Sequence, residues 1–126
     1  MSCAALPGLG DHDVSIIAAT AVGTADELPA HCRVEGVILP AVRFWLLLPE
    51  NWNGRFYMFG NGGFAGQSAD DPLVSALVVA GLQHGFAAAF TDTGHDQTVQ
   101  PLGTFAHDDL AAEVDYAFRA VHVTAV

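Results

Sequence analysis

The chain has 126 residues, enough for one domain and too few for two of ordinary size. Hydrophobic residues make up 52% and charged residues 14% of it, a composition that excludes intrinsic disorder. Four Lys and Arg residues against fourteen Asp and Glu residues give a net charge of −10, so we expect no nucleic-acid partner and no basic membrane-binding patch. The longest apolar runs, 41–48 and 73–82, are far shorter than the roughly 20 residues of a membrane-spanning helix.

The first strands are predicted from short apolar and β-branched runs. Residues 1–13 carry Pro7 and two glycines and predict a polar tail, without the basic segment that opens a signal peptide. Residues 15–22 predict a strand, and 23–31 a turn region. Two further strands, 34–39 and 42–48, meet at Pro40 and favour a hairpin or a pair of neighbouring antiparallel strands.

A strand, a glycine-rich loop, a helix and a buried strand follow. Residues 55–59 predict a strand that runs directly into the loop GNGGFAG, 60–66. A capping Asp followed by Pro at 71–72, and Gly85, predict a helix over 73–84. This helix is apolar nearly all round, so we expect it to be buried on more than one side. The apolar run 86–91 is typical of a parallel strand covered on both faces.

The C-terminal region predicts a polar loop over 91–103 and a second helix over 108–123. Three acidic residues near the start of this helix suit its dipole and are expected to be solvated, not catalytic: Asp108, Asp109 and Glu113. One apolar stripe is expected to bury the helix against the core: Leu110, Val114, Ala117, Phe118 and Val121.

The order of these elements predicts an α/β fold over residues 1–126. Antiparallel strands lead into parallel strands with flanking helices, as at the start of an α/β sheet. A helix after a parallel strand normally crosses back to begin the next strand, and the sequence ends before one. We therefore expect an incomplete sheet, from an N-terminal fragment or a truncated gene product. Its exposed edge would favour self-association.

The loop 60–66 is the most informative motif, and three interpretations compete. Gly60, Gly62 and Ala65 fit the GxGxxG/A dinucleotide fingerprint, with Asp92 as the ribose ligand, although the helix is expected to start too late for it. Alternatively, the loop supplies backbone N–H groups to an oxyanion hole, as the glycine-rich segment before the first helix does in α/β hydrolases. The third interpretation is a tight turn that simply needs glycine.

Two cysteines, Cys3 and Cys32, are too few and too far apart for a structural zinc site. They are either a disulfide that ties down the tail or two unpaired small hydrophobic side chains. His95 lies near Asp92 and Asp96, but no third ligand follows at a regular spacing, so we expect hydrogen bonding within the loop and no metal site.

Four blocks together carry a family resemblance: LPAHCRVEG (28–36), LLLPENWNGRFYMFGNGGFAG (46–66), GFAAAFTDTGH (85–95) and DYAFRAVHVT (115–124). They resemble the tannase and feruloyl esterase family of α/β hydrolases, over nearly the whole chain. The resemblance implies the N-terminal part of an α/β-hydrolase sheet from a secreted or periplasmic serine esterase. Its expected substrates are phenolic esters, galloyl or feruloyl in kind.

The resemblance also assigns roles to residues of this chain. It implies that the backbone N–H groups of Gly62, Gly63 and Phe64 contribute to an oxyanion hole, with Gly63 preferred. It implies a disulfide between Cys3 and Cys32. From its position in the chain, we expect the TDTGH block, 91–95, to brace the end of the buried strand beside the glycine loop.

The chain departs from the family pattern in what it lacks. The family's nucleophilic serine follows a cysteine on a strand-to-helix elbow, and its acid and histidine come later. None of the four serines here, Ser2, Ser15, Ser68 and Ser75, lies in a GxSxG motif. The family's calcium-bearing lid would also lie downstream, so no cofactor is expected in this chain. We therefore expect the isolated chain to be inactive.

Overall fold

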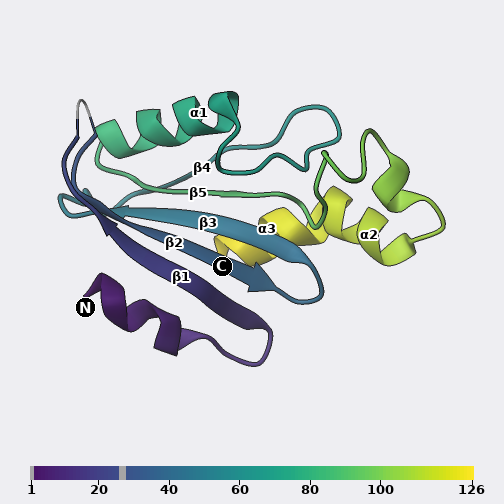
Figure 1. The fold of residues 1–126 in the computed structure, drawn as a ribbon, viewed down its shortest axis with the longest axis horizontal. Helices are drawn as coiled ribbons and strands as arrows, with labels where there is room; N and C mark the ends of the chain where they lie inside the picture. The colour runs from purple at the N-terminus through teal and green to yellow at the C-terminus, as the bar shows by residue number, and fades with distance from the viewer. Residues whose placement is uncertain (1, 26–27) are drawn as a thin grey trace.

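The computed structural model describes residues 2–25 and 28–126, and its centre is a five-stranded mixed sheet (Figure 1). Neighbouring strands follow the order β1-β2-β3-β5-β4. The pairs β1–β2, β2–β3 and β3–β5 are antiparallel, and β4–β5 is parallel. The predicted change from antiparallel to parallel strands is therefore confirmed. The bounds are β1 Val14–Val22, β2 His31–Ile38, β3 Val42–Pro49, β4 Phe56–Met58 and β5 Ala87–Thr91.

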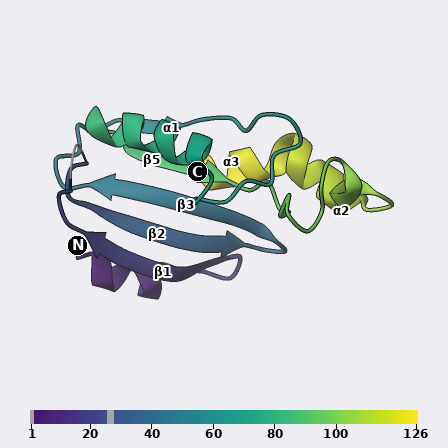
Figure 2. The same ribbon diagram turned by 45° about the horizontal axis from the view of Figure 1, so that its top comes forward.

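Helices cover both faces of the sheet, because alternate side chains of each strand point to opposite sides. Trp45 of β3 and Phe90 of β5 stack at 4.7 Å and pack against α1, Pro72–Gln83. On the other face, Val42 of β3 packs against Ala120 of α3, Ala120–Ala125. Every residue of β5 is buried, as the continuous apolar run predicts. Figure 2 shows the layered arrangement from a second side.

Helix α1 begins where the sequence predicts. The Asp71 side chain accepts hydrogen bonds from Leu73 N and Val74 N, and Pro72 occupies the first turn. The expected burial on more than one side is wrong, because α1 buries a single face while Leu73 is 67% exposed. The buried face consists of Val74, Val78, Gly81 and Leu82, spaced as one side of a helix. The apolar composition of a helix indicates which side chains can be buried, but not how many of its faces have a neighbouring element to pack against.

The C-terminal helical segment buries a different face from the one that the sequence predicts. It consists of α2 (Leu110–Val114), a π-helical turn (Asp115–Arg119) and α3, after a short 3-10 turn at Thr104–Ala106. The segment turns Asp115 and Ala120 inward. The predicted apolar stripe instead lies on the exposed side: Leu110, Val114, Ala117, Phe118 and Val121.

Polar anchors explain why this helical segment has its observed phase. The buried Asp115 carboxylate accepts a hydrogen bond from Arg119 Nη1 at 2.8 Å, and Arg119 Nη2 donates to the Leu39 carbonyl. Leaving these charged groups unpaired in the interior would cost more than exposing a few apolar side chains. Asp109 caps the first turn by accepting from Ala112 N at 3.0 Å.

The N-terminal segment is more ordered than the predicted tail. Residues Cys3–Leu9 form a 3-10 helix beside β1, and a disulfide joins Cys3 to Cys32 of β2 with the Cα atoms 5.7 Å apart. The disulfide that the family resemblance implies is confirmed. Closing this 29-residue separation contributes about 3–4 kcal/mol in the chain-entropy model. Of the predicted turn 23–31, residues 26 and 27 lie outside the described residues, as does Met1.

No helix within the described residues is long and apolar enough to cross a membrane.

Candidate active site

Two loops meet at one edge of the sheet and form the candidate site. The glycine loop 60–66 follows β4, and a polar loop over 92–97 follows β5. Because β4 and β5 are parallel, both loops leave the sheet at the same end, where ligand sites of α/β sheets form. The loops are joined directly: Asn61 Nδ2 donates to the Thr91 carbonyl at 2.9 Å, and Gln97 N donates to the Gly66 carbonyl at 3.0 Å.

The glycine loop forms a tight turn whose first amides remain free. Ala65 N donates to the Gly62 carbonyl at 3.1 Å, and Gly63 has a φ of 59°, a conformation that glycine adopts without strain. The N–H groups of Gly62, Gly63 and Phe64 donate to no described residue. Gly62 and Gly63 are exposed, and Phe64 is half exposed. All three predicted oxyanion residues therefore lie in one short turn with unused donors.

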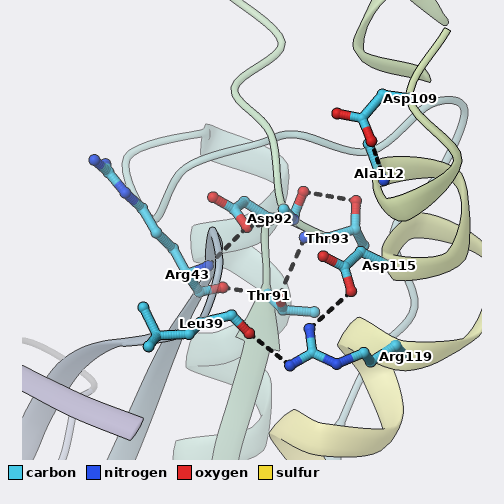
Figure 3. A network of polar contacts seen from close by, with 10 residues as sticks. Leu39, Arg43, Thr91, Asp92, Thr93, Asp109, Ala112, Asp115 and Arg119 are labelled. Atoms are coloured by element: carbon cyan, nitrogen blue, oxygen red, sulfur yellow. Dashed lines mark hydrogen bonds and ion pairs between the residues drawn. The ribbon is translucent and has the colours of Figure 1, made fainter. Parts of the chain in front are cut away.

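At the start of the polar loop after β5, the side chains of Asp92 and Thr93 are buried and hydrogen-bonded (Figure 3). Asp92 Oδ1 accepts from Arg43 N at 3.0 Å and from Gly94 N at 2.8 Å. Thr91 Oγ1 donates to the Arg43 carbonyl at 2.8 Å and accepts from Thr93 N at 3.1 Å. These bonds tie the end of β5 to β3, so the TDTGH block braces the buried strand beside the glycine loop.

The pKa values of two carboxylates in this loop are shifted in opposite directions. Burial raises the pKa of Asp92 from 3.8 to about 6, although the Gly94 and Arg43 amides favour its charged form. The exposed Asp96 has a lowered pKa, because its carboxylate accepts from the hydroxyl and the backbone N–H of Thr98, at 2.6 and 2.8 Å. Asp92 is thus a structural acceptor at a desolvated position, and Asp96 closes an exposed turn.

His95 packs beneath the glycine loop as part of an aromatic cluster. Its ring stacks on Phe105 with centroids 3.8 Å apart, and Tyr116 lies edge-on at 6.4 Å. Burial lowers the pKa of His95, and the adjacent Phe64 backbone opposes this shift. Neither ring nitrogen reaches full hydrogen-bond geometry with a partner among the described residues. A Cβ added to Gly66 would lie 2.7 Å from Nε2 of this ring. His95 therefore supports the loop by close packing.

A small cavity of about 230 Å³ lies between the two loops and β3. Among the described residues, no three His, Cys, Asp or Glu side chains are grouped so as to hold a metal ion. The polar side chains that line the cavity are Arg43, Gln67, Ser68, Asp92, His95 and Asp96.

The four serines are dispersed over the molecule. Ser15 lies on β1, Ser75 on α1, Ser68 between the glycine loop and α1, and Ser2 before the N-terminal 3-10 helix. All four are exposed, and none is hydrogen-bonded to a histidine within the described part of the chain. The structure therefore offers no serine with the partners of a nucleophile.

The dinucleotide alternative does not match the geometry. Its fingerprint needs a helix N-terminus inside the glycine motif, whereas α1 begins at Pro72, after Gly66 and two aspartates. Asp92, its expected ribose ligand, uses Oδ1 to accept backbone N–H groups. The late start of the helix, which the sequence predicts, thus favours the oxyanion loop over the dinucleotide site.

Sequence reasoning missed one polar contact to the glycine loop. The Tyr116 hydroxyl donates to the Gly63 carbonyl at 2.8 Å. Tyr116 lies in the DYAFRAVHVT block but outside the apolar stripe from which the helix was interpreted. Its phenolic hydroxyl was the available signal, because such groups find a partner when partly buried.

Comparison with known proteins assigns the family. The family model described as tannase and feruloyl esterase matches residues 26–126. The chain belongs to the tannase and feruloyl esterase family. This result confirms the resemblance carried by the four sequence blocks, and the similar proteins are carboxylic ester hydrolases by name.

Two curated relatives illustrate the match within this tannase and feruloyl esterase family. The chain is 34% identical over 119 residues to the mono(2-hydroxyethyl) terephthalate hydrolase of Piscinibacter sakaiensis, covering 82% of this chain and 20% of the hydrolase. It is 35% identical over 79 residues to a probable feruloyl esterase B-2 of Aspergillus flavus, covering 63% of this chain and 14% of the esterase. The chain thus spans a fifth or less of these relatives' length.

A solved structure supports the fold. Feruloyl esterase B from Aspergillus oryzae superposes with a TM-score of 0.76 at 23% sequence identity, over 96% of this chain and 27% of that one. The predicted fold class, an α/β fold in which antiparallel strands lead into parallel strands with flanking helices, is confirmed.

Proposed function

We propose that this chain supplies the oxyanion loop of a serine carboxylic ester hydrolase. The observation that carries the proposal is the turn at Gly62, Gly63 and Phe64, whose N–H groups have no acceptor among the described residues. The turn lies at the end of a parallel strand pair and is fixed to the neighbouring loop by hydrogen bonds. Fixed donors that need no rearrangement are what a developing oxyanion requires.

In the proposed reaction, a serine hydroxyl attacks the ester carbonyl carbon while a histidine accepts its proton. The carbonyl oxygen gains negative charge and receives hydrogen bonds from the turn, each worth about 3–4 kcal/mol in comparable sites. The tetrahedral intermediate expels the alcohol, which takes a proton from the histidine, and water then releases the acid from the acyl-enzyme. We place the serine, histidine and acid outside this chain and expect the isolated chain to be inactive.

We propose esters of aromatic acids as the substrate class. The relatives are named for ferulate and terephthalate esters, which share an aromatic ring conjugated with the ester carbonyl, directly in terephthalate and through a vinyl group in ferulate. We also propose that the protein acts in an oxidising compartment, secreted or periplasmic, because its disulfide would not persist in a reducing one. The family's calcium-bearing lid would lie outside this chain. The short β4 lies at one edge of the sheet, and we propose this edge as a route to self-association.

A segment exchange tests the function. This chain replaces the matching segment of the Piscinibacter hydrolase, and hydrolysis of methyl ferulate, methyl gallate and mono(2-hydroxyethyl) terephthalate is measured for the chimera and for the isolated chain. We expect activity from the chimera alone. In the chimera, Gly63→Ala should lower kcat about tenfold or more with little change in KM, because it strains a residue at φ 59°. Gly60→Ala, in open space, is the matched control.

Two outcomes would contradict the proposal. Hydrolysis by the isolated chain above background would show that it contains its own nucleophile. A folded chimera with no activity on all three esters would remove the loop from catalysis.

A further inference from the structure

One hydrogen bond connects the C-terminal helical segment to the candidate oxyanion turn. The Tyr116 hydroxyl donates to the Gly63 carbonyl oxygen at 2.8 Å, across a separation of 53 residues. Tyr116 belongs to the π-helical turn Asp115–Arg119, a kind of helix irregularity that is common at functional sites. The π-helical turn is itself anchored, through the ion pair of Asp115 with Arg119 at 2.8 Å and the contact of Arg119 with the Leu39 carbonyl. Tyr116 therefore contacts the candidate oxyanion turn from a fixed position.

The bonded carbonyl shares its peptide group with the Phe64 N–H. Within the described residues, the only cis peptide bond is Leu39–Pro40, so the Gly63–Phe64 peptide is trans. In a trans peptide, the C=O and the N–H point in opposite directions within one rigid plane. Holding the Gly63 oxygen on Tyr116 therefore turns the Phe64 N–H away from Tyr116 and fixes its direction.

The other N–H groups of the turn are constrained differently. The Ala65 N–H is already used, because it donates to the Gly62 carbonyl. The Gly63 N–H belongs to the preceding peptide, whose carbonyl accepts that same bond. Of the free N–H groups in the turn, that of Phe64 is therefore the one whose peptide plane is held by a side chain outside the loop, that of Tyr116.

An aromatic stack fixes the tyrosine ring that makes this contact. The Tyr116 ring packs on Phe105 with centroids 5.2 Å apart, and Phe105 stacks on His95 at 3.8 Å. His95 in turn lies against the α-carbon region of Gly66, at the far end of the glycine loop. The same cluster therefore supports the loop at Gly66 and directs the Tyr116 hydroxyl to Gly63.

We propose that Tyr116 is a positioning residue for the oxyanion hole, and that the donor it orients is the Phe64 N–H. This inference rests on the proposed function, and it moves the preferred donor from Gly63 to Phe64. Tyr116 does not contact the substrate; it acts through the peptide plane that it holds.

The contact is tested by nuclear magnetic resonance on the full chain. Tyr116→Phe removes the hydroxyl and keeps the ring stack, so thermal unfolding should change little. The Gly63 carbonyl-carbon and Phe64 amide-nitrogen resonances should shift, because the carbonyl loses its donor. Tyr57→Phe is the matched control, since the Tyr57 hydroxyl makes no hydrogen bond to a described residue and its ring packs elsewhere, beside Phe59 and Phe86. Unchanged Gly63 and Phe64 resonances in folded Y116F would overturn the proposal.

A second measurement uses the unmodified chain. The Phe64 amide should exchange rapidly with solvent, and methylphosphonate, a small tetrahedral oxyanion, should shift its resonance. Y116F should lose most of that shift, whereas Y57F should keep it. A protected Phe64 amide in the unmodified chain would overturn the assigned donor. If Y116F moves the Gly63–Phe64 peptide but methylphosphonate affects no amide of the turn, the positioning role stands and the oxyanion function fails.

Discussion

The two loops at the carboxyl end of β4 and β5 are neighbours of opposite character. In the loop over 92–97, Asp92 and Thr93 are buried, and the Asp92 carboxylate accepts two backbone N–H groups. The loop over 60–66 leaves the successive N–H groups of Gly62, Gly63 and Phe64 without a described acceptor. Donors kept free in one loop need a rigid support, which comes from Thr91 at the end of β5 and from Gln97 of the other loop. The difference separates framework from site, so substitutions in the two loops should have different consequences.

The largest expected effect lies where the loops touch, at Gly66. This residue has a φ of 80°, and an added Cβ would lie 2.7 Å from both His95 Nε2 and Gln97 N. Left-handed strain and overpacking each cost on the order of 1–3 kcal/mol, so Gly66→Ala should lower the free energy of unfolding by about 3–4 kcal/mol. Chemical denaturation followed by circular dichroism measures this loss.

Gly60→Ala is the control for Gly66→Ala within the same loop. An added Cβ at Gly60 meets nothing within 4 Å, and its φ is not in the left-handed region. Its stability should change by less than about 0.5 kcal/mol. Equal losses in the two variants would mean that the contact with His95 and Gln97 does not anchor the loop.

The next largest effect is expected from Asp92→Asn, which should raise the free energy of unfolding. Burial raises its pKa from 3.8 to about 6, so the folded state binds a proton that the unfolded state releases. Stability from this group is fully present below pH 3.8 and is lost as the pH rises through about 6. The rise of the pKa from 3.8 to about 6 corresponds to about 3 kcal/mol, and the weaker acceptor strength of an amide oxygen reduces the gain expected from Asp92→Asn to about 2 kcal/mol.

The Asp92→Asn gain should depend on pH. It should appear at pH 7 and disappear near pH 4, where the carboxyl of the unmodified chain is protonated when folded. Paired denaturation curves at the two pH values measure it. A loss of stability at pH 7 would show that the charged form of Asp92 is required by the fold.

Thr91→Val tests the inward bonding of the polar loop with little change in shape. The buried hydroxyl donates to the Arg43 carbonyl and accepts from Thr93 N, so its removal leaves the buried Thr93 N–H unpaired, while the Arg43 carbonyl keeps the hydrogen bond from Asp92 N. We expect a loss of about 1.5 kcal/mol in unfolding free energy. Thr104→Val removes one bond, to the Pro101 carbonyl, at an exposed position and should cost less than about 0.5 kcal/mol. Similar losses in both would remove the distinction between framework and surface.

How much of this arrangement is predictable from sequence differs between these regions. Local chemistry determined the start of α1, because Asp71 and Pro72 act within one helical turn. The buried strand β5 was predictable because its apolar run needs cover on both faces. The three free amides were found through glycine spacing and family resemblance, since glycine marks places where the backbone itself is used.

The parts that could not be predicted depend on contacts between distant segments. The C-terminal apolar stripe shares one helix face as expected, but the pairing of Asp115 with Arg119 and the Leu39 carbonyl decides which face points inward. The Tyr116 contact with Gly63 joins residues 53 positions apart and follows from the same helix phase. Periodicity predicts which residues lie together; it does not contain the partner across the fold.

Asp96 gives the smallest expected effect and reverses the sign found at Asp92. Its exposed carboxylate accepts two hydrogen bonds from Thr98, which lower its pKa below the usual 3.8. This stabilisation is present above the unfolded-state pKa and is lost as the pH falls through the lowered folded value. Asp96→Asn should therefore weaken the fold slightly at pH 7, and this loss should shrink as the pH falls below 3.8, as thermal unfolding over this pH range would measure. If Asp96→Asn instead stabilised the chain at pH 7 as Asp92→Asn should, net negative charge and not the local environment of each carboxylate would govern the loop.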